Sequence, residues 1–139
     1  MAAGLTIAEQ DFERFARVFT GVIDEISDPS LFDAQLETDG PLAPQQMTLE
    51  AARMLERGIW GQGFPAPLFA DDFEVAEQRL LKDQHVKLTL RKGDAVFEAI
   101  RFRHPDPAPD RLRLAYRLSC NEYRGVQSLQ LLVDDWEER

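Results

Sequence analysis

Few residues in this 139-residue sequence have the types and spacing that catalysis requires. Metal-dependent hydrolysis needs clustered histidines and carboxylates, whereas His85 and His104 lie apart, at the start of one expected strand and the end of another. Cys120 has no neighbouring histidine or cation-rich helix start that would activate its thiol as a nucleophile. Asp134 and Asp135 follow the last expected strand, where solvated acids are usual. The sequence therefore predicts no catalytic residue and no metal site in this chain.

Basic side chains at alternate positions are a stronger chemical signal. Residues 86–91 and 111–118 alternate apolar side chains with mostly Lys and Arg, and successive side chains of a strand point to opposite faces. One face is therefore predicted to be core and the other cationic, which suits a phosphate backbone. Tyr123, in a turn beside this face, offers a surface on which a base can stack. The expected nucleic-acid contacts are Lys87, Arg91, Arg101, Arg103, Arg113, Arg117, Tyr123 and Arg124.

Charge is unevenly distributed along the chain. The net charge of −9 by itself argues against a nucleic-acid partner. Residues 1–70 hold four basic and 11 acidic residues, whereas residues 79–124 hold 11 basic and six acidic ones, a net charge of +5. Acidic residues that flank this stretch, within residues 71–77 and 134–138, cancel its charge. Because any half-exposed sheet carries polar side chains outward, an ordinary solvated face is the alternative to a nucleic-acid interface.

Cysteine content and hydropathy bound the class of protein. At 44% apolar and 29% charged residues, the composition is that of a globular protein. A single cysteine excludes a disulfide framework and indicates a reducing compartment. The N-terminus has no basic stretch followed by an apolar run, and no apolar segment reaches the roughly 18 residues that suggest a membrane span. We therefore expect a cytoplasmic protein without membrane contact.

The first part of the chain is predicted to be helical. Thr6 and Glu9 form a capping-box pattern, which marks a helix start. Apolar side chains then recur every three or four residues from Phe12 to Ile26, so they share one face of the helix. The Ser-Asp-Pro sequence of residues 27–29 ends it.

Three further segments lead to the second part. Residues 31–38 fit a short edge strand, and residues 48–57 fit a second helix that Gly58 ends. The glycines and prolines of residues 60–70 make a semi-rigid linker, and its aromatic side chains are expected to pin the two parts together. Two helices and one strand form a poor core alone, so we expect the first part to pack on the second or on something larger.

The second part changes to the two-residue period of strands. Five strand-length runs separated by turn residues fit a small closed or partly open barrel. The third run alternates less cleanly than the others, and we expect a β-bulge there. The fold class is therefore α+β, an N-terminal helical segment joined to a five-stranded antiparallel barrel. The expected strands are residues 73–82, 86–91, 96–103, 111–118 and 126–133.

Six segments resemble the C-terminal portion of the RecJ family, the single-strand-specific DNA exonucleases of bacteria, and they occur in the same order. These segments are AAGLTI (2–7), WGQGFPAPLF (60–69), HVKLTLR (85–91), FEAIRF (97–102), LAYRLSCNEYRG (114–125) and SLQLLVDD (128–135). The Trp-Gly-Gln-Gly-Phe-Pro joint and the Asn-Glu-aromatic-Arg-Gly turn are the most specific of these matches.

This resemblance implies that the chain is part of a larger enzyme. RecJ proteins run from a catalytic domain that uses Mn or Mg, through a DHH-associated domain, to an OB-fold. The resemblance implies that residues 1–59 end the associated domain, residues 60–70 form a linker, and residues 71–139 form an OB-fold-like barrel. The parent activity is 5′ to 3′ degradation of single-stranded DNA in recombination and repair. The catalytic metal motifs are missing, so we expect no cofactor in this chain and no activity from it alone.

The resemblance also implies partners for this chain, and the sequence departs from the family pattern at several positions. Single-stranded DNA and the catalytic core of the parent enzyme are the expected partners. The alternative function is a protein-docking module whose basic face receives the acidic tail of single-strand-binding protein. Only residues 1–4 match the end of the GGHxMAAG-type motif of the associated domain. Tyr123 stands where family members often have Trp, and Arg101 and His104 replace smaller or amide residues.

Overall fold

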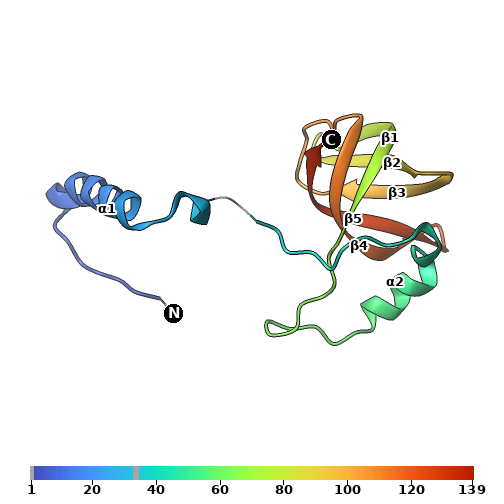
Figure 1. Ribbon diagram of the computed structural model, residues 1–139, viewed down its shortest axis with the longest axis horizontal. Helices are drawn as coiled ribbons and strands as arrows, with labels where there is room; N and C mark the ends of the chain where they lie inside the picture. The colour runs from blue at the N-terminus through green and yellow to red at the C-terminus, as the bar shows by residue number, and fades with distance from the viewer. Residues whose placement is uncertain (1, 33–34) are drawn as a thin grey trace. The chain divides into compact units, whose positions relative to one another are not determined.

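The computed structural model describes residues 2–32 and 35–139 of the chain. The chain divides into two compact units, residues 1–36 and residues 37–139. The second unit contains all strands of the described residues (Figure 1), and the hydrophobic core lies in it. Within the described ranges, no helix is long and apolar enough to cross a membrane.

The described residues of the first unit include an amphipathic helix, as the apolar spacing predicts. α1 runs from Phe12 to Ile26, after a short 3-10 turn at Glu9–Asp11. Ser27 closes the helix by donating its backbone N–H to the carbonyl of Ile23 at 2.9 Å. The predicted end of the helix at residues 27–29 is therefore confirmed.

Two other expectations for this unit are wrong. The capping box of Thr6 and Glu9 does not form, because α1 begins after Asp11, whose backbone is already helical and whose side chain makes no cap bond. The described part of residues 31–38 forms no edge strand, because residues 29–32 make a 3-10 turn and residues 35–38 have no strand partner. Residues 33–34 lie outside the described residues.

The apolar face of α1 stays exposed within its own unit. Phe15 and Phe19 stack with ring centres 5.7 Å apart, but Phe12 is 64% exposed and Ile26 is 73% exposed. A helix with such a face normally buries it against a neighbour. That this face packs on a further surface stays a prediction.

The second unit is a closed five-stranded barrel (Figure 1). The order around the barrel is β1-β2-β3-β5-β4, and β4 pairs with β1 to close it. Four neighbouring pairs are antiparallel, as expected, whereas β3 and β5 run parallel because β4 separates them in the chain. The strands are β1 (Phe69–Leu81), β2 (His85–Lys92), β3 (Ala95–Arg101), β4 (Arg111–Tyr123) and β5 (Val126–Glu138).

The predicted alternation locates the core. Leu88 and Leu90 of β2, and Leu112 and Leu114 of β4, are fully buried, whereas the residues between them face outward. The inward side chains of the five strands form the buried core of this unit. The outward-facing side chains and the ends of the barrel are therefore the parts that a ligand can reach.

The expected β-bulge in the third strand is absent. β3 pairs with β2 in unbroken register along its whole length. The bulges lie instead in β1, between Val75 and Glu77, and where Ala115 and Tyr116 of β4 meet β5. β3 alternates poorly for a different reason, since outward-facing Ile100 is also buried, at 8% exposed.

Residues 37–59 belong to the same compact unit as the barrel, whereas their sequence pattern is that of the helical first part. α2 runs from Leu49 to Glu56, and the Thr48 hydroxyl caps it by accepting a hydrogen bond from the Ala51 N–H at 3.1 Å. Met47 and Ala52 are buried in the same core cluster as the barrel strands. The helix at 48–57 was predictable from its periodicity, but periodicity does not tell which body its apolar face covers.

α2 also covers an open edge of the sheet. β1 pairs with β4 only as far as Tyr116, so beyond this residue β4 has β5 on one side alone. The Glu56 carboxylate accepts hydrogen bonds from the Cys120 backbone N–H at 2.8 Å and from the Ser119 hydroxyl at 3.0 Å. The Glu56 side chain of α2 thus hydrogen-bonds to the backbone of β4 at this unpaired edge.

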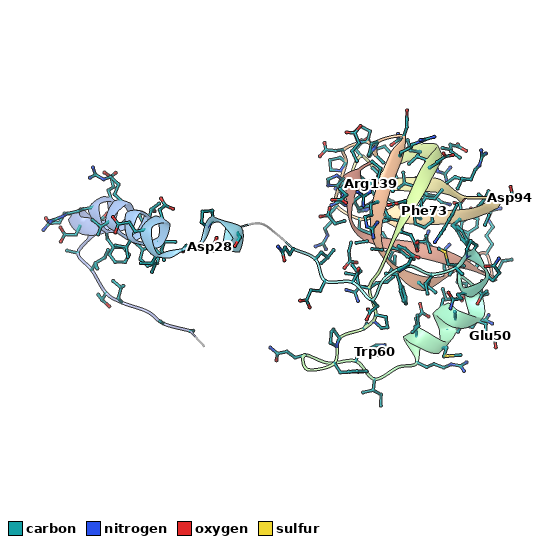
Figure 2. The ribbon with its side chains drawn as sticks, viewed as in Figure 1. Asp28, Glu50, Trp60, Phe73, Asp94 and Arg139 are labelled. Carbon is teal, nitrogen blue, oxygen red and sulfur yellow. The ribbon has the colours of Figure 1, made fainter. Side chains whose placement is uncertain are left out.

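Aromatic residues tie the segment after α2 to that helix, whereas the expectation that they pin the two parts of the chain together stays a prediction. Figure 2 shows Trp60 just beyond the end of α2, and its indole N–H donates to the carbonyl of Leu55 at 2.8 Å. Its ring stacks on Phe64 with centres 5.6 Å apart. Gly58 lies so close beneath the indole that a Cβ there would clash with it.

A buried polar cluster joins residues 39–47 to the barrel. Asp71 of β1 is only 5% exposed, and its carboxylate pairs with the Lys92 ammonium. The carboxylate also accepts hydrogen bonds from the Tyr116 hydroxyl at 2.7 Å and the Leu42 N–H at 3.0 Å. Lys92 donates in turn to the Leu42 carbonyl, so every buried polar atom of the cluster has a partner.

This environment changes the titration of Tyr116. Burial raises the pKa of its hydroxyl well above the ordinary value, and the hydrogen bond to the Asp71 carboxylate raises that pKa further. Both causes disfavour the phenolate, because ionisation would place a second negative charge beside a buried one.

Ionisation of Tyr116 and unfolding are therefore expected to coincide. The folded-state pKa exceeds the unfolded value of about 10, so this contribution to stability is complete below about pH 10 and is lost as pH rises further. In Tyr123→Phe, Tyr116 is the sole remaining tyrosine, and phenolate absorbance reports on it alone. We expect this absorbance to increase only where circular dichroism shows unfolding. Phenolate absorbance from a protein with native circular dichroism would contradict the argument.

Candidate nucleic-acid interface

The outer face of β1, β2 and β3 carries its polar side chains in rows, because the register of the strands aligns them. Arg79 of β1 lies opposite Lys87 of β2, and we call this pair the cation row. Two residues along each strand, Glu77 lies opposite Thr89, and Thr89 lies opposite Glu98 of β3. We call these three residues the acceptor row.

A third row completes this face. Glu74 of β1 lies opposite Arg91 of β2, and Arg91 lies opposite Val96 of β3. The three rows together hold three cations and three carboxylates. The face that the sequence predicts to be cationic is therefore balanced, since the acids come from the neighbouring strands.

A hollow of about 250 Å³ lies where the cation row meets the acceptor row. The Lys87 ammonium lies 2.9 Å from a carboxylate oxygen of Glu98, and the Thr89 hydroxyl donates to the other oxygen at 3.2 Å. The residues lining the hollow are Glu77, Gln78, Arg79, Lys87, Thr89 and Glu98.

Acidic residues that flank the basic stretch in sequence fold back onto its arginines. Asp135 lies 2.7 Å from Arg101, and Asp134 lies 3.1 Å from Arg117. Asp72 lies 3.3 Å from Arg113 in the same way. Four of the eight predicted contact residues are thus engaged in ion pairs, namely Lys87, Arg101, Arg113 and Arg117.

Arg101 is held more firmly than the other three. Its guanidinium stacks 4.2 Å from the centre of the Trp136 ring, and His104 contacts the same ring edge-on at 5.0 Å. The Arg101 side chain is only 15% exposed. Arg101 and His104 therefore pack on Trp136 at the end of the barrel, and the phosphate contact of Arg101 stays a prediction.

Five of the 11 basic residues in the basic stretch make no ion pair in the described part of the chain. Three of them, Arg91, Arg103 and Arg124, are predicted contacts, whereas Arg79 and Lys82 are not among the predicted contacts. The five are Arg79, Lys82, Arg91, Arg103 and Arg124.

Two unpaired cations gather with an exposed aromatic residue near the turn between β1 and β2. Lys82 lies in that turn, and the backbone N–H of Arg103 donates to Nδ1 of His85, the first residue of β2, at 2.9 Å. Phe102 contacts His85 edge-on at 5.1 Å and is 55% exposed. We call Lys82, Phe102 and Arg103 the turn cluster. Phe102 could be recognised from the sequence only as a strand residue.

Tyr123 and Arg124 lie at the opposite end of the barrel from the turn cluster. β3 and β5 run parallel, so the turn before β5 lies at the end where β3 begins, whereas Phe102 and Arg103 follow the end of β3. Tyr123 is 65% exposed, and the Arg124 guanidinium lies 5.1 Å from its ring centre. The predicted contacts therefore do not form a single patch.

The closed barrel, its strand order and its outward polar rows are those of the OB-fold class, small barrels whose outer face and loops bind oligonucleotides or oligosaccharides. In the described ranges, no three His, Cys, Asp or Glu side chains gather closely enough to hold a metal ion. The Mn or Mg of the RecJ resemblance thus finds no fitting ligands among these residues, and we assign no metal chemistry to them.

Comparisons with known proteins narrow this class. A family model described as the RecJ OB domain matches residues 38–135. The single-stranded-DNA-specific exonuclease RecJ of Escherichia coli (strain K12) is 39% identical over 143 residues, which cover 97% of this chain and 25% of that protein. The same enzyme of Haemophilus influenzae is 38% identical over 96% of this chain and 25% of its own length.

A solved structure supports the fold. The crystal structure of RecJ in complex with Mn²⁺ from Thermus thermophilus superposes with a TM-score of 0.74 at 22% identity, covering 98% of this chain and 20% of that chain. The present chain belongs to the RecJ OB domain family. It spans about a quarter of the length of the curated relatives that it matches.

Proposed function

We propose that the barrel binds single-stranded DNA and guides it within a RecJ-like 5′ to 3′ exonuclease. The observation that carries this proposal is the set of unpaired cations and exposed aromatic side chains around the outer face of β1, β2 and β3. The relatives are single-stranded-DNA-specific exonucleases by name. Catalysis would belong to the part of such an enzyme that lies outside this chain.

The arrangement suits a single strand better than a duplex. Exposed aromatic rings stack on unpaired bases regardless of sequence, and neighbouring cations neutralise the backbone. The turn cluster and the cation row would hold phosphates at one end of the face. Tyr123 would stack on a base at the other end, and the strand would cross the face between them.

The ion pairs explain why we expect this binding to be weak. A phosphate that approaches Arg113 or Arg117 must compete with Asp72 or Asp134, which already occupy those guanidinium groups. Residues 1–70 add an excess of seven negative charges. The unpaired cations are therefore expected to supply most of the electrostatic attraction.

Arg103→Ala is expected to weaken the salt dependence of oligo-dT binding. Each phosphate contact on a single strand contributes about 0.7 to the slope of log affinity against log salt, so the slope should fall by about that amount. Fluorescence anisotropy titrations over a series of salt concentrations measure it. The matched control is Arg57→Ala, which removes the same charge after the end of α2. Equal slopes for the two variants would exclude Arg103 from the interface.

Tyr123→Ala is expected to lower the affinity for oligo-dT about tenfold, because one stacked base contributes roughly 1 to 3 kcal/mol. Tyr123→Phe keeps the ring and should retain most of the affinity. The same titration at low salt compares the two variants. If Tyr123→Ala binds oligo-dT as tightly as Tyr123→Phe does, no base stacks on Tyr123.

A protein-docking role is the second candidate, and one observation favours it. A largely apolar hollow of about 210 Å³ lies between α2 and β4, and its lining includes Leu55, Trp60 and Leu118 together with the charged Glu56 and Arg117. A largely apolar hollow that also contains a cation suits a peptide that carries apolar residues and an acidic one. Competition between an acidic tail peptide of single-strand-binding protein and oligo-dT tests whether the peptide and the DNA bind the same surface.

A further inference from the structure

The acceptor row has a consequence for the choice of base. We propose that Glu98 accepts a hydrogen bond from the exocyclic amino group of a base seated in the hollow, so that the barrel prefers cytosine to thymine. This inference rests on the proposed binding of single-stranded DNA and adds a specificity to it.

Glu98 is a preorganised acceptor. One carboxylate oxygen contacts the Lys87 ammonium at 2.9 Å, and the other accepts from the Thr89 hydroxyl at 3.2 Å. A carboxylate offers about four lone-pair positions, so these two contacts leave acceptor positions free. The Glu98 side chain is 45% exposed. A fixed and accessible acceptor loses little entropy when a donor binds to it.

The rows also decide which part of a nucleotide lies over Glu98. Carboxylates repel phosphates, so the backbone of a bound strand must avoid the acceptor row. The cation row lies two residues away along the strands, or about 6.7 Å. Phosphates on Arg79 and Lys87 would therefore leave the base to extend toward Glu98. Both rows line the same hollow.

Cytosine and thymine differ in the group that meets such an acceptor. Cytosine carries an amino donor at N4, whereas thymine carries a carbonyl acceptor at the corresponding position. An ionised carboxylate can only accept. The Thr89 hydroxyl already donates to Glu98, so it offers thymine no free donor. With Arg79 and Lys87 donating to phosphates, the thymine carbonyl at Glu98 would set two acceptors against each other.

The test compares labelled oligo-dC and oligo-dT of about ten nucleotides, a length within the site sizes of OB-folds, in low-salt, slightly alkaline buffer. The 139-residue chain is expected to bind oligo-dC about fivefold more tightly, as for one amino-group contact. Glu98→Gln presents an amide donor as well as an acceptor and frees Lys87. In this variant the preference should disappear, while the affinity for oligo-dT rises.

Glu74→Gln is the matched control. It removes the same charge and breaks the contact with Arg111 at 3.1 Å, but Glu74 does not line the hollow. Its affinity for oligo-dT should rise, and its ratio of oligo-dC to oligo-dT affinity should stay that of the unchanged chain. Equal binding of the two oligonucleotides by the unchanged chain overturns the inference alone. An unchanged ratio of oligo-dC to oligo-dT affinity in Glu98→Gln also overturns the inference alone. Failure to bind either oligonucleotide overturns the proposed function together with it.

Discussion

Asp71 is the one buried carboxylate in the described part of the chain, and three distant segments supply its partners. Lys92 comes from the end of β2, Tyr116 from the middle of β4, and the Leu42 backbone from the segment before α2. A buried charge that loses a partner is strongly destabilising, so these segments can only fold together. The segment before α2 accordingly belongs to the same compact unit as the barrel.

The same folding redistributes charge over the surface. Acids from both sides of the basic stretch lie against its arginines once the barrel closes, and the outer rows of β1, β2 and β3 are balanced. The net charge counted along the basic stretch therefore overstates its attraction for phosphate. Exposed ion pairs of this kind add only about 0 to 1 kcal/mol each to stability. Their larger effect is to determine which cations remain available for a ligand.

Strand periodicity made the barrel predictable, because the inward leucines of β2 and β4 have an unambiguous two-residue repeat. The placement of residues 37–59 was not predictable, since it depends on the contacts of Asp71 with groups far away in sequence. The ion pairs were equally unpredictable from the sequence, because the strand register alone brings Asp134 next to Arg117. Phe102 was missed for a related reason: a strand-like residue just past the end of a strand loses its alternation, and the sequence does not show where the strand ends.

The hydrogen bonds from β4 to Glu56 have a consequence for association between molecules. A closed barrel has no free strand edge, but β4 beyond Tyr116 extends past the closure and exposes backbone that a strand from another molecule could join. Glu56 occupies the amide of Cys120 on this edge, and its negative charge lies where an incoming strand would place its carbonyl groups. α2 therefore contributes to the core and also disfavours edge-to-edge aggregation through β4.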